Sequence, residues 1–498
     1  DFYNHWHTSE YYQDYLAVQE DEKWDFAPVY ENQKNDVHPP LFYLLLRLAM
    51  EMVPGEFSKW PGIVLNIVIA GVNTVVLYAV VKKLLKGITA GKKNVETKAL
   101  ILTAVAGLTV AAVSAVVYIR MYMLLALFVT LTVWLHLKLW EEKGRNWKTL
   151  MGIGVVALLG VLTQYYYLFF LAPMWVVMAV KYGREKRWKD FGAYTGVLMV
   201  AGAISLVIWP WSIQHMFFGY RGQGVIGSLL DVPGLIVGIW RYIEVLDYNV
   251  FYRTLAMWVL CVGICLFVAF ATNGERDERR LARNDGPSQV STKRQVATQR
   301  LDIWNIVLWP TIVYFLLVAA VSPFIELRYI MPITGLATVI VIAGAYVVIG
   351  KVATEKWRNV VVGTMMGVMM MAAPVQLRLG WMRIELLYRD RQQVMSLVKE
   401  NPDVPILYFI TTENNRFLDN ILPFAEAKES YLALDMLEPT AQEVKEILAG
   451  KDLTDGLIVF VSTSQDVEEA LKAVSEATGF TRVDYIQGVN TCDVYFFQ

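Results

Sequence analysis

Long apolar segments separated by short charged loops limit the fold of this chain more than any other feature of its sequence. About 20 consecutive apolar residues carry a helix across a bilayer, and several segments approach that length. With 56% hydrophobic residues, the chain is predicted to be a mainly α-helical, polytopic membrane protein. Crossings are predicted near residues 61–81, 99–119, 121–139, 149–163, 165–180, 191–210, 253–272, 303–321, 329–350 and 358–376.

Lysine and arginine concentrate in every second loop between these segments. The basic loops fall near residues 82–98, 138–148, 181–189, 273–302 and 351–358. Basic loops stay on the cytoplasmic side of a membrane, so these loops are predicted to be cytoplasmic. The first 60 residues and the C-terminal region then lie outside the cytoplasm.

This topology requires that residues 41–53 do not cross the membrane. The segment is short and contains Arg47 and Glu51, which favours an amphipathic helix at the outer surface. An ordinary crossing is the alternative, but it would break the alternation of basic loops. The predicted domains are an outer first loop with interfacial helices (1–60), a multi-helix transmembrane domain (61–380) and a soluble C-terminal domain (385–498).

The C-terminal region has the sequence pattern of a small α/β domain outside the cytoplasm. Residues 404–410 and 457–461 are continuous apolar runs typical of buried strands. Residues 440–448 and 467–478 have the periodicity of amphipathic helices, and Thr440 with Glu443 forms a capping-box pattern. Residues 483–498 are predicted to form one or two strands. The domain has no glycine-rich phosphate loop and no metal-ligand spacing; it binds an acceptor or covers the membrane core.

Asp36 and His38 precede two prolines at the start of the 41–53 segment. Proline suits the first turn of a helix and makes the preceding residue extended, so a helix is predicted to start near Pro40. A carboxylate can act as a base on an acceptor hydroxyl, and a histidine can donate to a phosphate or position an acid. This pair is therefore the predicted catalytic site. The alternative is that both residues only cap and orient the helix.

Further polar residues fall at predicted outer helix ends. Arg120 and Arg328 are suited to bidentate contacts with a phosphate. Lipid snorkelling is the alternative for Arg120, and local pairing with Glu326 is the alternative for Arg328. Gln164 and Tyr165 are candidates for a sugar pocket, whereas the tyrosines that follow them fit an aromatic belt at the membrane surface.

The stretch Asp36-Val37-His38-Pro39-Pro40-Leu41 resembles a loop of the dolichyl-phosphate-mannose protein mannosyltransferases and of their bacterial relatives in the GT-C superfamily of membrane glycosyltransferases. Arg120 with Tyr122 resembles an Arg-x-Tyr signature of this family. Arg328-Tyr329-Ile330-Met331-Pro332 resembles its later Arg-Tyr-x-x-Pro segment. The resemblance covers residues 30–350 and implies substrate-binding roles for Arg120, Tyr122, Arg328 and Tyr329.

Family resemblance implies an inverting transfer of a sugar from a polyprenyl-phosphate donor on the outer face of a plasma membrane, in this case a bacterial one. The acceptor is a glycan, a lipid or a protein. The family also has an acidic pair after its first helix, which has no counterpart here, so the principal base is expected upstream of Asp1 and Asp36 becomes a second acid. Relatives often have histidine at the position of Gln164, which weakens the assignment of Gln164 to the sugar pocket.

Two other classes of function stay open from the sequence. A transporter or flippase for lipid-linked sugars would have ionisable groups near the bilayer midplane, and a non-catalytic assembly protein would have no polar cluster at the outer helix ends. The net charge of −1 gives no general attraction for nucleic acid. Cys261, Cys265 and Cys492 show neither a disulfide framework nor a metal site, and no cofactor is predicted beyond the lipid-phosphate donor as substrate.

Overall fold

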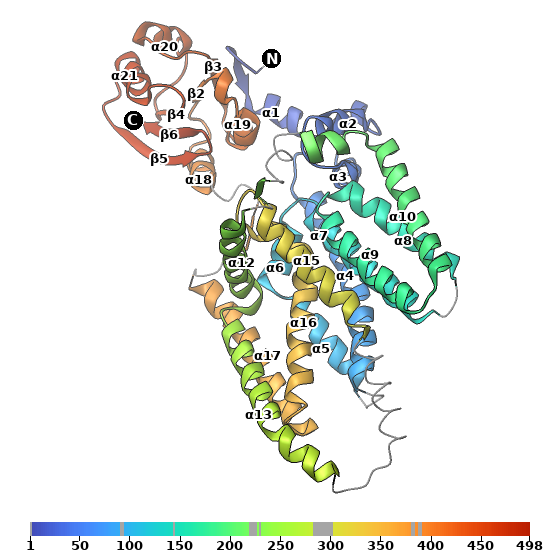
Figure 1. The fold of residues 1–498 in the computed structure, drawn as a ribbon. Coiled ribbons are helices and arrows are strands. Elements are labelled where there is room, and N and C mark those ends of the chain that lie inside the picture. Colours follow the sequence, from blue (N-terminus) through green and yellow to red (C-terminus); the bar gives the residue numbers. More distant parts are fainter. Residues whose placement is uncertain are drawn as a thin grey trace. The chain divides into compact units, whose positions relative to one another are not determined.

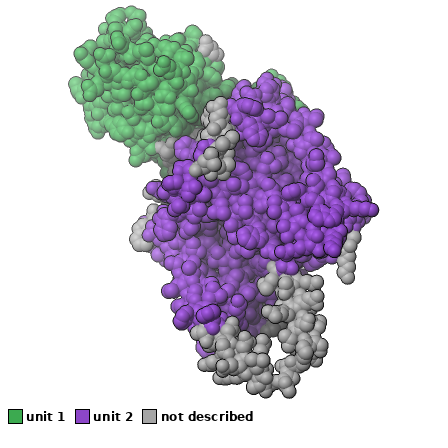
Figure 2. Space-filling view, viewed as in Figure 1, with its two compact units in different colours: residues 1–24, 50–59, 386–498 green, residues 25–49, 60–385 purple. Residues whose placement is uncertain are grey.

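The computed structural model describes residues 2–89, 94–142, 145–218, 227–228, 231–281, 302–379, 384–386 and 391–498. The chain divides into two compact units, coloured separately in Figure 2. One unit contains residues 1–24, 50–59 and 386–498, and the other contains residues 25–49 and 60–385. The stretch predicted as a single first loop, residues 1–60, therefore contributes to both units.

The larger unit consists of helices (Figure 1). Its α-helices are α2 (Ala27–Lys34), α3 (Leu41–Met50), α4 (Trp60–Thr89), α5 (Val95–Gly107), α6 (Val110–Val117), α7 (Tyr122–Glu141), α8 (Trp147–Thr163), α9 (Tyr167–Arg184), α10 (Trp188–Ile208), α12 (Val232–Leu246), α13 (Leu255–Leu281), α15 (Asn305–Val321), α16 (Met331–Ile349) and α17 (Glu355–Arg378). Short turns of other helix types are η2 (Gln214–Phe218), η3 (Asp247–Phe251) and η4 (Leu327–Tyr329).

Five described helices, α4, α7, α10, α16 and α17, are long and apolar enough to cross a membrane. The number rises to seven if each of two bent helix pairs forms one crossing. One bent pair is α5 and α6, which meet at 60° and replace the straight helix predicted over residues 99–119. Thr109 explains the break, because its side chain accepts a hydrogen bond from the Ala112 N–H and starts a new helix.

Helices α7 and α16 form the centre of the larger unit, since most of their residues are buried. Helix α3 starts at Leu41, next to the prolines, and has 10 residues. Such a helix is about 15 Å long, half of the thickness of the hydrocarbon core, so α3 is too short to cross. This length agrees with the prediction that residues 41–53 do not span the membrane.

The smaller unit is built around one mixed sheet of six strands in the order β1-β3-β2-β4-β6-β5. Strands β3, β2 and β4 are parallel, and the outer pairings are antiparallel. The strands are β1 (Trp6–Thr8), β2 (Ile406–Ile410), β3 (Glu429–Leu434), β4 (Leu457–Ser462), β5 (Val483–Val489) and β6 (Cys492–Phe497). The helices are α1 (Ser9–Leu16), α18 (Gln392–Glu400), α19 (Ile421–Glu426), α20 (Ala441–Ile447) and α21 (Val467–Thr478), with short turns η1 (Glu20–Glu22), η6 (Thr412–Asn414) and η7 (Phe417–Asn420).

Helices cover both faces of this sheet (Figure 1). On one face of β2, Ile406, Tyr408 and Ile410 pack with α1, α18 and α19. On the other face, Leu407 and Phe409 pack with α20 and α21. Burial on both faces explains why β2 and β4 are continuous apolar runs. The capping box of Thr440 and Glu443 starts α20 as predicted.

Residues near the start of the chain complete this sheet. Trp6 on β1 lies opposite Tyr431 on β3, and the Tyr12 hydroxyl accepts a hydrogen bond from Ser430 at 2.9 Å. The predicted fold class, a mainly helical membrane protein with a C-terminal α/β domain, is confirmed. The contribution of β1 and α1 to that domain was not predicted.

Candidate functional site

Asp36 and His38 form a hydrogen-bonded pair directly before α3. The His38 Nδ1 lies 2.8 Å from one Asp36 carboxylate oxygen, and the other oxygen accepts the Val37 N–H at 2.7 Å. Both side chains are partly exposed, with Asp36 at 38% and His38 at 18%. The prolines explain this arrangement, because they end the preceding turn and begin α3 at the next residue.

Burial raises the pKa of Asp36, but its other contacts lower that pKa by more. The hydrogen bond and charge of His38, the Val37 N–H and the charge of Arg120 all favour the carboxylate form. The pKa of Asp36 is therefore held below its ordinary value of 3.8, and the group is ionised at neutral pH. Arg120 also lies close enough to Tyr43 on α3 to interact with it electrostatically.

The two arginines predicted from the sequence both lie near two tyrosines, Tyr118 and Tyr122. Arg120 lies between α6 and α7, where its N–H donates to the Tyr118 carbonyl at 2.6 Å. The Arg328 guanidinium, on η4, donates to the Tyr118 hydroxyl at 3.0 Å. Both guanidinium charges act on Tyr122. The fold thus brings together groups that are 208 positions apart, from Arg120 to Arg328.

Arg328 also makes the local ion pair that was the alternative to a phosphate contact. Its Nε lies 2.6 Å from a Glu326 carboxylate oxygen. The ring of Tyr329 packs against the ring of Tyr166, with 5.7 Å between the two centroids. The Tyr329 carbonyl accepts a hydrogen bond from the Tyr314 hydroxyl at 2.9 Å. The segment around Arg328 is therefore fixed by several contacts, and one guanidinium nitrogen is already used by Tyr118.

Gln164 and Tyr165 lie at the break between α8 and α9. The Gln164 side chain is buried and accepts the Tyr165 N–H at 2.8 Å, so it stabilises the break. Tyr165 lies within electrostatic range of Asp36, whose negative charge adds to the rise in its pKa. Burial raises the pKa of Tyr165 to about 12, so its hydroxyl stays protonated. Tyr167 is fully buried against Thr132, which corrects the prediction that it belongs to a surface aromatic belt.

His215, on η2, was not singled out from the sequence. Its Nε2 lies 3.1 Å from the Lys34 carbonyl, and its Nδ1 lies 3.0 Å from the Tyr165 hydroxyl. A carbonyl only accepts, so Nε2 donates to the Lys34 carbonyl. The Tyr165 hydroxyl in turn accepts the Trp209 indole N–H at 3.1 Å. An isolated histidine in a loop gave no signal of its own.

These contacts connect the Asp36 segment to the rest of the helical unit. Tyr30 on α2 packs edge-on against Trp209 with 4.7 Å between ring centroids, and the Lys34 ammonium lies 4.8 Å above the Trp211 ring. His215 is the only side chain among these that hydrogen-bonds both Tyr165 and the α2 backbone within the described residues. It therefore fixes α2, and with it Asp36, next to Tyr165.

Replacement of His215 by alanine is expected to lower sugar transfer about tenfold, because about 1.4 kcal/mol of hydrogen bonding that holds Asp36 in place is lost. The measurement is kcat/KM in a transfer assay. Tyr165→Phe combined with His215→Ala should cost little more than His215→Ala alone, since both break the same connection. His5→Ala, at an exposed histidine of the smaller unit, is the matched control. If the losses of kcat/KM from Tyr165→Phe and His215→Ala add in the double variant, the role of His215 in holding Tyr165 and α2 together is contradicted.

No group of three or more histidine, cysteine, aspartate or glutamate side chains arranged to hold a metal ion occurs in the described part of the chain.

Comparison with known proteins agrees with the sequence resemblance. Residues 37–211 match the family model described as dolichyl-phosphate-mannose-protein mannosyltransferase. The match includes His38, Arg120, Tyr122, Gln164 and Tyr165; it begins directly after Asp36 and ends before Arg328. Over this part of the chain, the match agrees with the predicted resemblance to the mannosyltransferase family.

Two solved structures resemble the whole chain more distantly. ArnT from Cupriavidus metallidurans bound to undecaprenyl phosphate is 10% identical, with 98% of this chain and 95% of that chain covered and a TM-score of 0.42. The apo state of the same protein has the same identity and coverage and a TM-score of 0.33. No curated protein sequence matches.

Proposed function

We propose that this protein transfers a sugar from a polyprenyl-phosphate donor to an acceptor hydroxyl at the outer membrane face, with inversion at the anomeric carbon. The observation that carries the proposal is the cluster at the start of α7. There the Asp36–His38 pair lies within electrostatic range of Arg120, the charges of Arg120 and Arg328 both act on Tyr122, and Arg328 donates to the Tyr118 hydroxyl. The family match over residues 37–211 supports the reaction class.

The arginines are assigned to the phosphate of the donor. In the transfer, the acceptor oxygen bonds to the anomeric carbon while the bond from that carbon to the lipid phosphate breaks. The proton of the acceptor hydroxyl passes to a base, and the phosphate leaves with additional negative charge. Two guanidinium groups held in advance by protein contacts stabilise this charge more in the transition state than in the bound donor. The pair with Glu326 keeps Arg328 in place before the donor binds.

Asp36 is assigned to the acceptor rather than to the role of principal base. A general base works best with a pKa near the working pH, whereas the pKa of Asp36 is held low by His38 and Arg120. An ionised, poorly basic carboxylate is suited to accept a hydrogen bond from the acceptor hydroxyl and to orient its oxygen. His38 fixes the carboxylate, and Tyr165 lines the same side of the site.

The orientation of the site follows from the basic loops. The loops after α4, α7 and α9 are rich in lysine and arginine, which supports a cytoplasmic position for the C-terminal ends of these helices under the positive-inside rule. The starts of α7 and α9, where Arg120 and Tyr165 lie, are then outside. A periplasmic reporter fused after Gln498 is expected to be active and a cytoplasmic one inactive. The reverse result would move the site to the cytoplasmic face.

The proposal is tested by incubating the purified full chain with radiolabelled polyprenyl-phosphate sugars and a membrane extract as acceptor. Transfer of label, with the anomeric configuration of the product opposite to that of the donor by NMR, is the expected result. Movement of intact labelled donor across a vesicle membrane without transfer would instead support a flippase. Binding without transfer or movement would support an assembly protein.

A further inference from the structure

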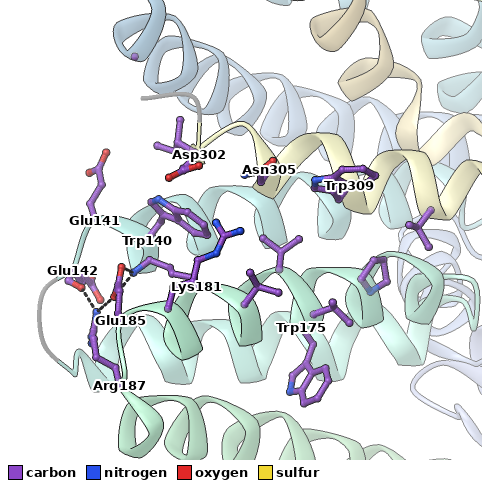
Figure 3. A pocket seen from close by; sticks show the side chains of 18 of the residues that line it. Trp140, Glu141, Glu142, Trp175, Lys181, Glu185, Arg187, Asp302, Asn305 and Trp309 are labelled. Carbon is purple, nitrogen blue, oxygen red and sulfur yellow. Dashed lines mark hydrogen bonds and ion pairs between the residues drawn. The ribbon is translucent and has the colours of Figure 1, made fainter. Parts of the chain in front are cut away.

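A cavity of about 1630 Å³ lies in the helical unit, away from the candidate site (Figure 3). Helices α7 and α9 begin beside Arg120 and Tyr165, and their last turns line the cavity with Trp140 and Lys181. The 20 residues of α7 extend over about 30 Å. The cavity is therefore a separate feature at the opposite helix ends.

The lining of this cavity is divided into an apolar and a charged part. Facing helices α9 and α15 supply the apolar part, with Pro173, Val176 and Val180 on one and Val313 and Leu317 on the other. The charged part gathers at the ends of α4, α7 and α9 and before α15. It consists of Lys83, Lys86, Lys181, Arg184 and Arg187 together with Glu141, Glu142, Glu185 and Asp302.

Several of these charges are already paired with each other. The buried Lys181 ammonium contacts both Glu185 carboxylate oxygens at 2.8 and 2.9 Å, and Arg187 contacts Glu185 at 3.0 Å, as the dashed lines in Figure 3 show. Lys83 pairs with Glu141 at 3.0 Å. These pairs shape the mouth of the cavity but leave little net charge to attract a ligand.

Arg184 and Asp302 differ from these paired residues. Both line the cavity, one at the end of α9 and the other before α15, and neither forms an ion pair with another described residue. Lys86 and Glu142 likewise form no ion pair within the described residues, although Glu142 accepts hydrogen bonds from Asn146 and Thr149. The cavity therefore presents two cations, Arg184 and Lys86, and the Asp302 carboxylate to a ligand, next to an apolar wall. Trp140 and Trp309 also line the cavity (Figure 3), and tryptophans are enriched at the boundary between lipid tails and headgroups.

We propose that this cavity binds one membrane glycerophospholipid whose headgroup contains both a phosphate and a primary ammonium, as in phosphatidylethanolamine. An acyl chain lies between the valines of α9 and α15, the phosphate faces Arg184 and Lys86, and the ammonium faces Asp302. A purely anionic headgroup would bring a negative charge to Asp302 without compensation. A small polar ligand would leave the apolar wall in contact with water.

The test is native mass spectrometry of the full chain, purified in mild detergent, stripped of lipid and then incubated with phosphatidylethanolamine or phosphatidylglycerol. One phosphatidylethanolamine per chain is expected to stay bound, with at least fivefold more retention than phosphatidylglycerol. Val313→Trp fills the apolar part and should abolish retention. Val155→Trp is the matched control, because Val155 is 51% exposed on α8 and does not line the cavity.

Asp302→Asn provides a second test that leaves the cavity volume unchanged. It should remove the preference for phosphatidylethanolamine while the total lipid retained stays within twofold of the wild type. Gel-filtration elution and circular dichroism check that each variant is folded. Equal retention by Val313→Trp and Val155→Trp would overturn the site, since lipid would then bind only to the outer surface. Equal retention of both lipids by the wild type would overturn the headgroup assignment.

Discussion

Replacement of Asp36 by asparagine in the full chain is expected to lower kcat/KM for sugar transfer about 100-fold, near the upper end of what the loss of a hydrogen bond to a charged group costs. Asparagine keeps the size of the side chain and still accepts a hydrogen bond from His38, but it loses the negative charge next to Arg120. The acceptor hydroxyl then loses its charged partner. The measurement is the initial rate of label transfer at varied acceptor concentration.

Glu31→Gln is the control for this variant, because Glu31 lies on α2 in the same segment and its pair with Lys34 is largely exposed, at 62% for the glutamate. Exposed pairs of this kind contribute little, so transfer should stay within twofold of the wild type. Wild-type rates for Asp36→Asn, with normal expression, would remove Asp36 from the site.

The pH profile gives a second readout of Asp36. The folded-state pKa of Asp36 is depressed, so its contribution is fully present above the ordinary value of 3.8 and is lost as pH falls through the lower folded pKa. The rate of wild-type transfer should therefore show no loss from Asp36 titration at any pH above 3.8. The Asp36→Asn variant should have a low transfer rate at every pH. A wild-type loss that begins well above that pH and is absent in the variant would contradict the low pKa.

Replacement of Arg328 by alanine is expected to lower kcat about 100- to 1000-fold, as observed when one donor that stabilises a developing anion is removed. Alanine removes the charge that faces the leaving phosphate and also leaves Glu326 without its partner. Arg328→Lys should recover part of the rate, because lysine keeps the charge but not the fork of donors that reaches both Tyr118 and a phosphate.

Two further variants separate the charge of Arg328 from its structural contacts. Glu326→Gln keeps the guanidinium and should lower kcat less than tenfold. Arg241→Ala, at an exposed arginine on α12, is the matched control and should have wild-type activity. Equal losses for Arg328→Ala and Glu326→Gln would show that the ion pair, rather than the positive charge, is what the reaction needs.

Helix positions were the part of the fold that local sequence could predict. The predicted crossing near 61–81 falls within α4, and the helix predicted over 467–478 is observed as α21, because apolar runs and caps act over a few residues. The break at Thr109 was missed, since a threonine N-cap inside a long apolar run is a weak signal. Strand β1 was missed because a three-residue strand forms only when β3 lies beside it.

Hydropathy and proline geometry are local properties, so a polytopic helical membrane protein with an Asp36–His38 pair at a helix start could be predicted from the order of residues alone. Tertiary structure alone decided which polar residues meet. Arg328 reaches Tyr118 from a distant segment, Gln164 turns back to its own backbone, and His215 connects Tyr165 to α2. Contacts of this kind depend on how helices pack against each other, and no short-range pattern in the chain records that packing.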